Sequence, residues 1–250
     1  MGFSTDLAYA LSAVHMAEAA GYPDLDDWQS DVLRAMPRRL LLNCSRQSGK
    51  TLLASLMCVH QAVYEPGSLA VVVAQRQDQA MELIRTCRTL YAALGRPVEA
   101  ESENKLSLEL ENGSRIRAIP STESSVRGLS NVGLLVIDEA SRVLDATYAA
   151  VLPFLAVSDG RLALLSTPAG CRGFFYDSYL HREEWHYVEV KATAVKRIPA
   201  TFLAEARRKV GEYYYSQEWL CAFNDSEQAV FRQEDIDAMF KDYAGWDLSA

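Results

Sequence analysis

The sequence has few cysteines and histidines, and none in a pattern typical of a metal site. Its five cysteines are widely spaced, and no two of them form a C-x-x-C pair. His181 and His186 have no cysteine beside them, so a zinc site is not expected. An odd number of isolated cysteines predicts reduced, mostly buried thiols, as in an intracellular protein.

Long apolar runs and an excess of basic residues are also lacking. No run approaches the ~18 apolar residues of a membrane span, and the N-terminus does not resemble a signal peptide, so we expect neither. The 25 Lys and Arg residues stand against 33 Asp and Glu, a net charge of −8. This charge disfavours nucleic-acid binding over the whole surface but allows a local basic groove. With 49% hydrophobic residues in 250, the chain can bury the core of one large or two small domains.

The octapeptide from Cys44 to Thr51 stands between a predicted strand, 39–43, and a predicted helix, 52–64. A strand, a polar loop ending in Gly-Lys-Thr and a helix together form the arrangement of a phosphate-binding loop. Backbone N–H groups at the helix start would cradle a di- or triphosphate, and the helix dipole favours its charge. Lys50 would reach the β- and γ-phosphates, and the Thr51 hydroxyl would bind Mg²⁺.

The octapeptide departs from the usual pattern G-x-x-x-x-G-K-[ST], because Cys44 stands at the position of the first Gly. Without that Gly, the loop entry lacks free access to a positive φ. Taken alone, the segment could be a chance Gly-Lys-Thr at a helix start. Arg46, inside the loop, is a further candidate for phosphate contact. The other loop residues predicted to contact a nucleotide are Ser45, Gln47, Ser48 and Gly49.

Strands and helices alternate over most of the first 168 residues, which predicts a mostly parallel sheet flanked by helices. The predicted strands are 39–43, 69–74, 133–137 and 161–165, with a hairpin formed by 105–111 and 114–119. Ligands of such sheets bind at the carboxyl ends of the strands. The phosphate loop, Asp138-Glu139 and Ser166-Thr167-Pro168 all follow strands, and this agreement favours a true nucleotide site.

Two acids directly follow an apolar strand. At such a position Asp138 would hold Mg²⁺ and Glu139 would activate the attacking water. Solvated acids at a strand end are the alternative. Thr167, after the next strand, could sense the γ-phosphate, although Thr-Pro also commonly begins an ordinary turn.

Other polar residues have weaker local signals. The Gln29 amide could read an adenine edge, or the Trp28-Gln29 pair could simply be half-buried. Arg127 could act as an arginine finger on its own or a neighbouring chain's site, or lie on the surface. Basic clusters that could contact DNA, or could be solvated faces, are Arg85, Arg88 and Arg96; Arg115 and Arg117; and Lys196, Arg197, Arg207, Arg208 and Lys209.

The sequence changes character after Pro168. A strand at 185–190 and helices at 201–210 and 212–223 are predicted there. We expect residues 1–175 to form a phosphate-loop core with N-terminal helices and 176–224 to form a small lid subdomain beside the nucleotide. Residues 225–250 form an acidic stretch that we interpret as a linker.

Together these motifs resemble the ATPase domain of phage terminase large subunits. That family's phosphate loop commonly lacks the first Gly. The segments that carry the resemblance are Trp28-Gln29, Ser45–Thr51, Ser125–Leu129, Leu135–Ala140, Ser166–Gly170, Gly173–Tyr176 and Glu218–Phe223.

The resemblance implies a P-loop NTPase fold and an ATPase that uses Mg²⁺ and moves double-stranded DNA into a procapsid. It implies catalytic roles for Glu139, Lys50, Arg127 and Arg46. Its implied partners are the portal protein, the terminase small subunit and further copies of the chain in a pentameric ring, or a monomer in solution. No membrane is implied, and the location is the host cytoplasm.

Family members usually continue into an RNase H-like nuclease domain. The acidic stretch at 225–250 is too short for one, so we expect no DNA cleavage by this chain. A helicase-like nucleic-acid ATPase with its second domain elsewhere is an alternative. A third possibility is a protein that binds nucleotide only to assemble on a partner.

Overall fold

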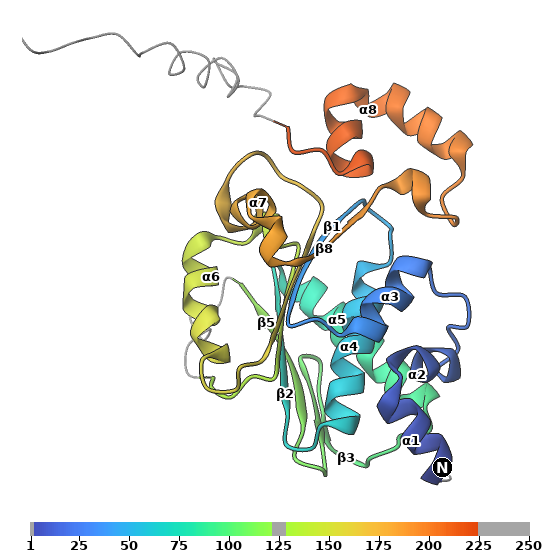
Figure 1. Ribbon diagram of the computed structural model, residues 1–250, viewed down its shortest axis with the longest axis vertical. Coiled ribbons are helices and arrows are strands. Elements are labelled where there is room, and N and C mark those ends of the chain that lie inside the picture. The colour runs from blue at the N-terminus through green and yellow to red at the C-terminus, as the bar shows by residue number, and fades with distance from the viewer. Residues whose placement is uncertain (1–2, 122–128, 225–250) are drawn as a thin grey trace, which may run out of the picture.

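The computed structural model describes residues 3–121 and 129–224. One eight-stranded sheet crosses the molecule in the order β3-β4-β5-β2-β6-β7-β1-β8 (Figure 1). Neighbouring strands pair in parallel, except for the antiparallel pairs β3–β4 and β4–β5. This confirms the predicted, mostly parallel α/β sheet. The strands are β1 (Arg39–Cys44), β2 (Leu69–Ala74), β3 (Ala100–Glu103), β4 (Ser107–Leu110), β5 (Arg115–Pro120), β6 (Leu134–Asp138), β7 (Arg161–Ser166) and β8 (His186–Val190).

Helices cover both faces of the sheet, with α1 to α5 on one side and α6 and α7 on the other (Figure 1). Side chains alternate along a strand, so Leu40 and Leu42 enter one core and Leu41 enters the other. The α-helices are α1 (Phe3–Leu11), α2 (Ala13–Ala19), α3 (Asp27–Ala35), α4 (Lys50–Tyr64), α5 (Gln77–Ala93), α6 (Asp145–Val151), α7 (Gly173–Leu180) and α8 (Ala200–Leu220). Short 3₁₀ helices are η1 (Ala140–Arg142), η2 (Leu152–Leu155), η3 (Arg182–Glu184) and η4 (Ala192–Ala194).

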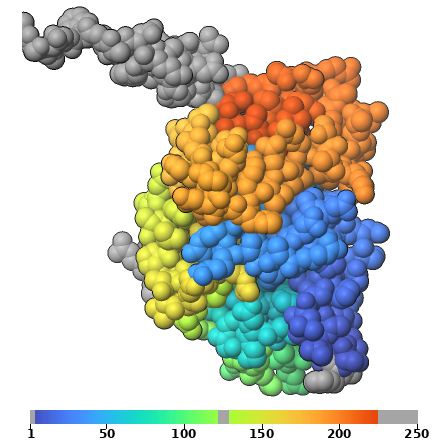
Figure 2. All heavy atoms as spheres, viewed as in Figure 1, coloured from blue at the N-terminus to red at the C-terminus, as the bar shows by residue number. Residues whose placement is uncertain are grey.

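The segment predicted as a lid divides between the sheet and a separate helical part. Its strand, β8, pairs in parallel with β1 and forms an edge of the main sheet. The two helices predicted beyond it are joined as α8, with Gly211 at φ 80° and ψ 165° marking a sharp kink between them. Figure 2 shows the residues from α7 onward, in orange and red, capping one end of the molecule. The proposed boundary between core and lid stays a prediction, but β8 lies in the sheet.

One strand, β3, is not predicted from the sequence because its composition is polar. β3 has the sequence Ala-Glu-Ser-Glu and lies at the opposite edge of the sheet, where its central residues are exposed. An edge strand needs few apolar residues, so its sequence lacks the pattern of a buried strand. In the described part of the chain, none of the helices combines the length and the apolar character that crossing a bilayer requires.

Candidate active site

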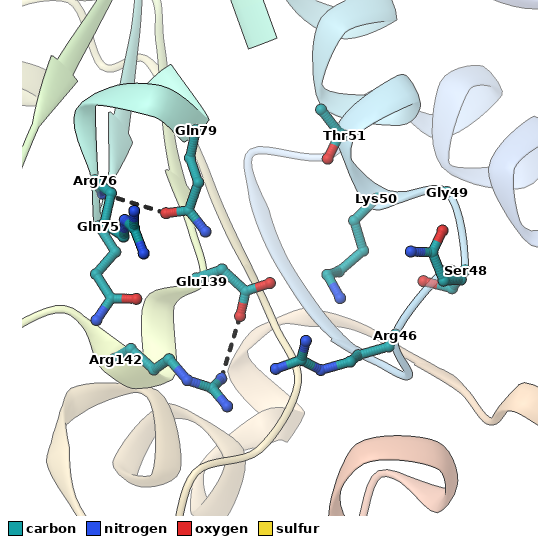
Figure 3. Close-up of a pocket in the computed structure, with 11 residues that line it drawn as sticks. Arg46, Ser48, Gly49, Lys50, Thr51, Gln75, Arg76, Gln79, Glu139 and Arg142 are labelled. Atoms are coloured by element: carbon teal, nitrogen blue, oxygen red, sulfur yellow. Dashed lines mark hydrogen bonds and ion pairs between the residues drawn. The ribbon is translucent and has the colours of Figure 1, made fainter. Parts of the chain in front are cut away.

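A cavity of about 450 Å³ opens where β1, β2 and β6 end. In Figure 3, Arg46 and Lys50 extend from the phosphate loop toward Glu139 and Arg142 on the facing wall. The cavity therefore lies at the strand ends, where a parallel sheet binds its ligands. Its lining residues are Arg46, Gln47, Ser48, Gly49, Lys50, Thr51, Gln75, Arg76, Gln79, Glu139 and Arg142.

Cys44 is the last residue of β1 and is fully buried. It is not among the residues of positive φ; in this loop those are Gln47, at 59°, and Gly49, at 99°. The backbone turns after Cys44, so the missing first Gly removes nothing that this conformation needs. Burial raises the pKa of the Cys44 thiol to about 12, against the opposing charge of Lys50, and this makes it an unreactive core residue.

Lys50 begins α4 and points back along the loop. Its Nζ donates to the carbonyl oxygens of Ser45 at 3.2 Å and Cys44 at 3.4 Å, and the side chain is buried. Ser45 is fully buried and donates its N–H to Val190 of β8 at 2.9 Å. The loop places the Lys50 ammonium on the cavity wall, beside backbone N–H groups at a helix N-terminus.

Gln29 braces the phosphate loop from the side of α3. Its Nε2 donates to Gly49 O at 3.2 Å, and its Oε1 accepts the Asp26 N–H at 3.1 Å. Gly49 has a φ of 99°, which other residues rarely adopt, and a Cβ there would also lie 2.8 Å from Nε2, so the position favours glycine. The Gln29 side chain is 1% exposed, with both ends of its amide engaged by backbone. Adenine reading by Gln29 stays a prediction.

Arg197 holds the loop from the segment before α8. Its Nη2 donates to Ser48 O at 2.9 Å and pairs with Asp26 Oδ2 at 2.9 Å. Sequence reasoning placed Arg197 only within a possible DNA-binding cluster. The structure shows that its guanidinium ties the phosphate loop to the start of α3, so this arginine is not a purely solvated residue.

Asp138 ends β6 and is buried, with its Oδ1 accepting the Glu139 N–H at 3.0 Å. Burial raises the pKa of Asp138 from 3.8 to about 6, and the neighbouring charge of Glu139 adds to the rise, while Lys50 opposes it. The Asp138 carboxylate and the Thr51 hydroxyl are oxygen ligands that suit Mg²⁺. Substrate phosphates and waters commonly fill the rest of the coordination shell of this ion. Within residues 3–121 and 129–224, no three His, Cys, Asp or Glu side chains form a metal-binding group.

Glu139 adopts the left-handed conformation at φ 51°, and its side chain lines the cavity. Its Oε2 pairs with Arg142 Nη1 at 3.3 Å. The 3₁₀ helix η1 produces this pairing, because it brings residues three apart to the same side. Arg142 was missed from the sequence; its position one turn after two acids is the signal that could have indicated it.

Thr167 is fully buried behind the cavity wall, and its Oγ1 accepts from Arg142 Nη1 at 3.2 Å. The preceding Ser166 hydroxyl lies 2.8 Å from Ser141 Oγ, which donates to Thr167 O at 2.7 Å. The end of β7 is thus joined to the segment after β6. In the structure the Thr167 hydroxyl is hydrogen-bonded to Arg142. Direct contact of Thr167 with a γ-phosphate therefore stays a prediction.

Arg46 meets the second half of α8. Its Nε pairs with Glu218 Oε2, and its N–H donates to Glu218 O at 3.0 Å. No local sequence pattern links these residues, which are 172 positions apart. Arg127 and its predicted finger lie outside the described residues.

The sequence matches a known family. The family model described as terminase large subunit, T4likevirus-type, N-terminal, matches residues 41–238. The large terminase subunit of Thermus phage G20c is 26% identical over 177 residues, which cover 61% of this chain and 35% of that protein. The chain thus spans about a third of the length of this curated relative.

Solved structures show the same fold. The large terminase ATPase domain of Thermus phage P74-26 superposes with a TM-score of 0.74 at 21% identity, covering 83% of this chain and 96% of that one. The large terminase of bacteriophage D6E in complex with ADP superposes with a TM-score of 0.61 at 12% identity, covering 83% of this chain and 52% of the other.

Proposed function

The chain belongs to the family of phage terminase large subunits, and on this basis we propose that it is an ATP-hydrolysing motor domain that moves double-stranded DNA into a procapsid. The observation that carries the proposal is the joint placement of Lys50, Arg46 and Glu139 around one cavity at the strand ends. A cationic loop facing a carboxylate supplies both a phosphate cradle and a group that can orient water.

Each residue has a distinct part in the proposed reaction. The loop N–H groups and Lys50 would hold the phosphates, while Thr51 and Asp138 would bind Mg²⁺, which neutralises developing charge. Glu139 would align the attacking water with the γ-phosphorus. Arg46 would contact phosphate from the loop. Nucleotide binding has a precedent in the D6E terminase solved with ADP.

Arg127 is proposed as an arginine finger acting on its own site or a neighbour's. A finger supplied by a neighbour would let two inactive variants complement each other. Mixing Arg127→Ala and Glu139→Ala chains should then restore part of the turnover in assembled rings. Absence of rescue, with assembly confirmed by mass, would contradict action on a neighbour.

The proposed partners follow from family membership. They are duplex DNA, a portal protein, a terminase small subunit and further copies of the chain in a ring of five on the procapsid, in the host cytoplasm. We propose no nuclease activity for this chain, and a cleavage assay on supercoiled DNA with Mg²⁺ tests that.

The experiment that tests the motor function uses duplex DNA carrying a short third strand. Assembled rings and ATP should displace the third strand while leaving the duplex paired, and Lys50→Ala rings should displace nothing. Separation of the duplex itself would indicate the helicase-like alternative. ATP binding without turnover in assembled rings would indicate a role limited to assembly.

A further inference from the structure

Arg142 contacts three different parts of the molecule with one guanidinium group. Its Nη1 donates to Glu139 Oε2 at 3.3 Å and to Thr167 Oγ1 at 3.2 Å, and its Nη2 donates to Glu218 Oε1 at 3.0 Å. These acceptors follow β6, follow β7 and belong to α8, respectively. The side chain is 26% exposed and lines the cavity, so it touches both the site and its supports.

Glu218 extends this set of contacts to the phosphate loop. One carboxylate oxygen accepts from Arg142 and the other from Arg46, which places the carboxylate between two arginines. Its side chain is 17% exposed, and both arginines line the cavity. A phosphate group held by the phosphate loop would meet Arg46. Glu218 and phosphate would therefore compete for Arg46.

The orientation of the Glu139 carboxylate matters because this group is proposed to align the attacking water. A misplaced catalytic group reacts far more slowly, because the attacking oxygen must approach in line. Glu139 has a left-handed backbone at the N-terminus of η1, and aligning water also requires control over the orientation of its side chain. Arg142 supplies that control, since its planar fork is held by Thr167 and Glu218.

We propose that Arg142 is a positioning residue for the reaction: it orients Glu139 and joins it, through Glu218, to the second half of α8. The proposal rests on the ATPase function proposed above. Arg142 acts on the water through Glu139 and not by contact with it. Phosphate binding draws Arg46 from Glu218 while Arg142 keeps its contacts, so the hold on α8 changes with the nucleotide in the cavity.

Steady-state ATP turnover of Arg142→Ala and Arg142→Lys tests the positioning role. Arg142→Ala should lower kcat by about 10²-fold with KM little changed, because orientation is lost and phosphate binding is kept. Arg142→Lys, which keeps the charge without the fork, should recover part of the loss. Wild-type kcat in Arg142→Ala would overturn the proposal.

Arg161 offers a matched control. Its side chain is 28% exposed and also joins several elements, through Glu65, Gln61 and Met36, but at the start of β7, away from the cavity. Arg161→Ala should lower Tm and leave kcat unchanged. Added guanidinium ion should restore turnover to Arg142→Ala only. Equal loss of kcat in both variants, or no rescue, would show a merely structural role.

The proposed competition between Glu218 and phosphate is tested by Glu218→Gln, with Glu212→Gln as the control. Glu212 lies on the same helix and pairs with Arg207 on the exposed surface. Removing the competing charge should lower KM for ATP several-fold in Glu218→Gln and not in Glu212→Gln. An unchanged or raised KM would contradict the competition. Absence of turnover in the wild type would instead refute the ATPase function itself.

Discussion

At the residue scale, Asp138, the proposed Mg²⁺ ligand, is buried where a charge lowers stability. It is an acid buried at the end of a strand, and its carboxylate lacks most of the water that would stabilise its charge. Because its native pKa, about 6, exceeds the ordinary 3.8, the native state binds more protons than the unfolded state between these values. Stability therefore falls as pH rises through this window, and the cost is complete above pH 6.

Asp138→Asn should make the protein more stable while removing its activity. The Asn side-chain oxygen can still accept the Glu139 N–H, but no buried charge remains. We expect the free energy of unfolding at pH 8 to rise by about 1–3 kcal/mol in the absence of Mg²⁺ and nucleotide. Urea denaturation measures this, and phosphate release should be undetectable.

The pH dependence provides the control for Asp138→Asn. The stabilisation should shrink as pH falls below 6, because the wild-type carboxyl then becomes protonated. Asp31→Asn, which changes an exposed acid paired with Arg34, should show no such trend. A variant less stable than the wild type at pH 8 would contradict a desolvated Asp138.

Gln29, which the sequence predicts to read adenine, contacts backbone in the structure. Both ends of its amide hold backbone, at Gly49 and Asp26. Gln29→Ala should therefore weaken ATP and GTP binding to a similar degree, because the loop loses its brace and neither base loses a partner. Titration of each nucleotide measures the two Kd values. Selective loss of ATP affinity would instead support adenine reading.

At the scale of elements, Gly211 sets the direction of the second half of α8. Its φ of 80° and ψ of 165° lie in a region that side chains essentially exclude. Gly211→Ala should cost about 1–3 kcal/mol at the kink. The two halves should then realign, separating Glu218 from Arg46. Hydrogen exchange over 212–220 should accelerate, and KM for ATP should change.

Gly21→Ala is the control for Gly211→Ala, because it introduces similar backbone strain at a position outside α8. Gly21 lies after α2 and also has a positive φ, 94°, and a Cβ added there would meet no atom within 4 Å. A similar loss of stability without any change in KM is expected. If both variants change KM alike, the kink has no specific connection to the nucleotide cavity.

The elements also show what sequence alone can reveal. β2, β6 and β7 are mostly apolar and buried, so they can be predicted from the sequence. The parallel topology then places the loops that follow them at one edge of the sheet. The contact between Arg142 and Glu218 joins residues 76 positions apart, and no periodicity encodes it. Likewise the bend after Cys44, which removes the need for a first Gly, depends on how the loop packs.

At the scale of the whole molecule, one end of the sheet gathers segments from distant parts of the chain. The phosphate loop, Gln75 and Glu139 follow three separate strands, and α8 reaches this end of the sheet from the cap seen in Figure 1. The net charge of −8 implies that any DNA contact is local and weakened by salt. The cavity at the strand ends, where we propose that nucleotide binds, is therefore the feature whose chemistry can be tested first.

The most direct measurement follows bound nucleotide and released phosphate together, with Mg²⁺ and ATP. The wild type should bind ATP and release phosphate. Lys50→Ala should do neither, because the phosphates lose their cation, and Glu139→Gln should bind ATP and release almost nothing. Wild-type phosphate release by Glu139→Gln, or ATP binding undiminished by Lys50→Ala, would contradict the assignment of this cavity as the ATPase site.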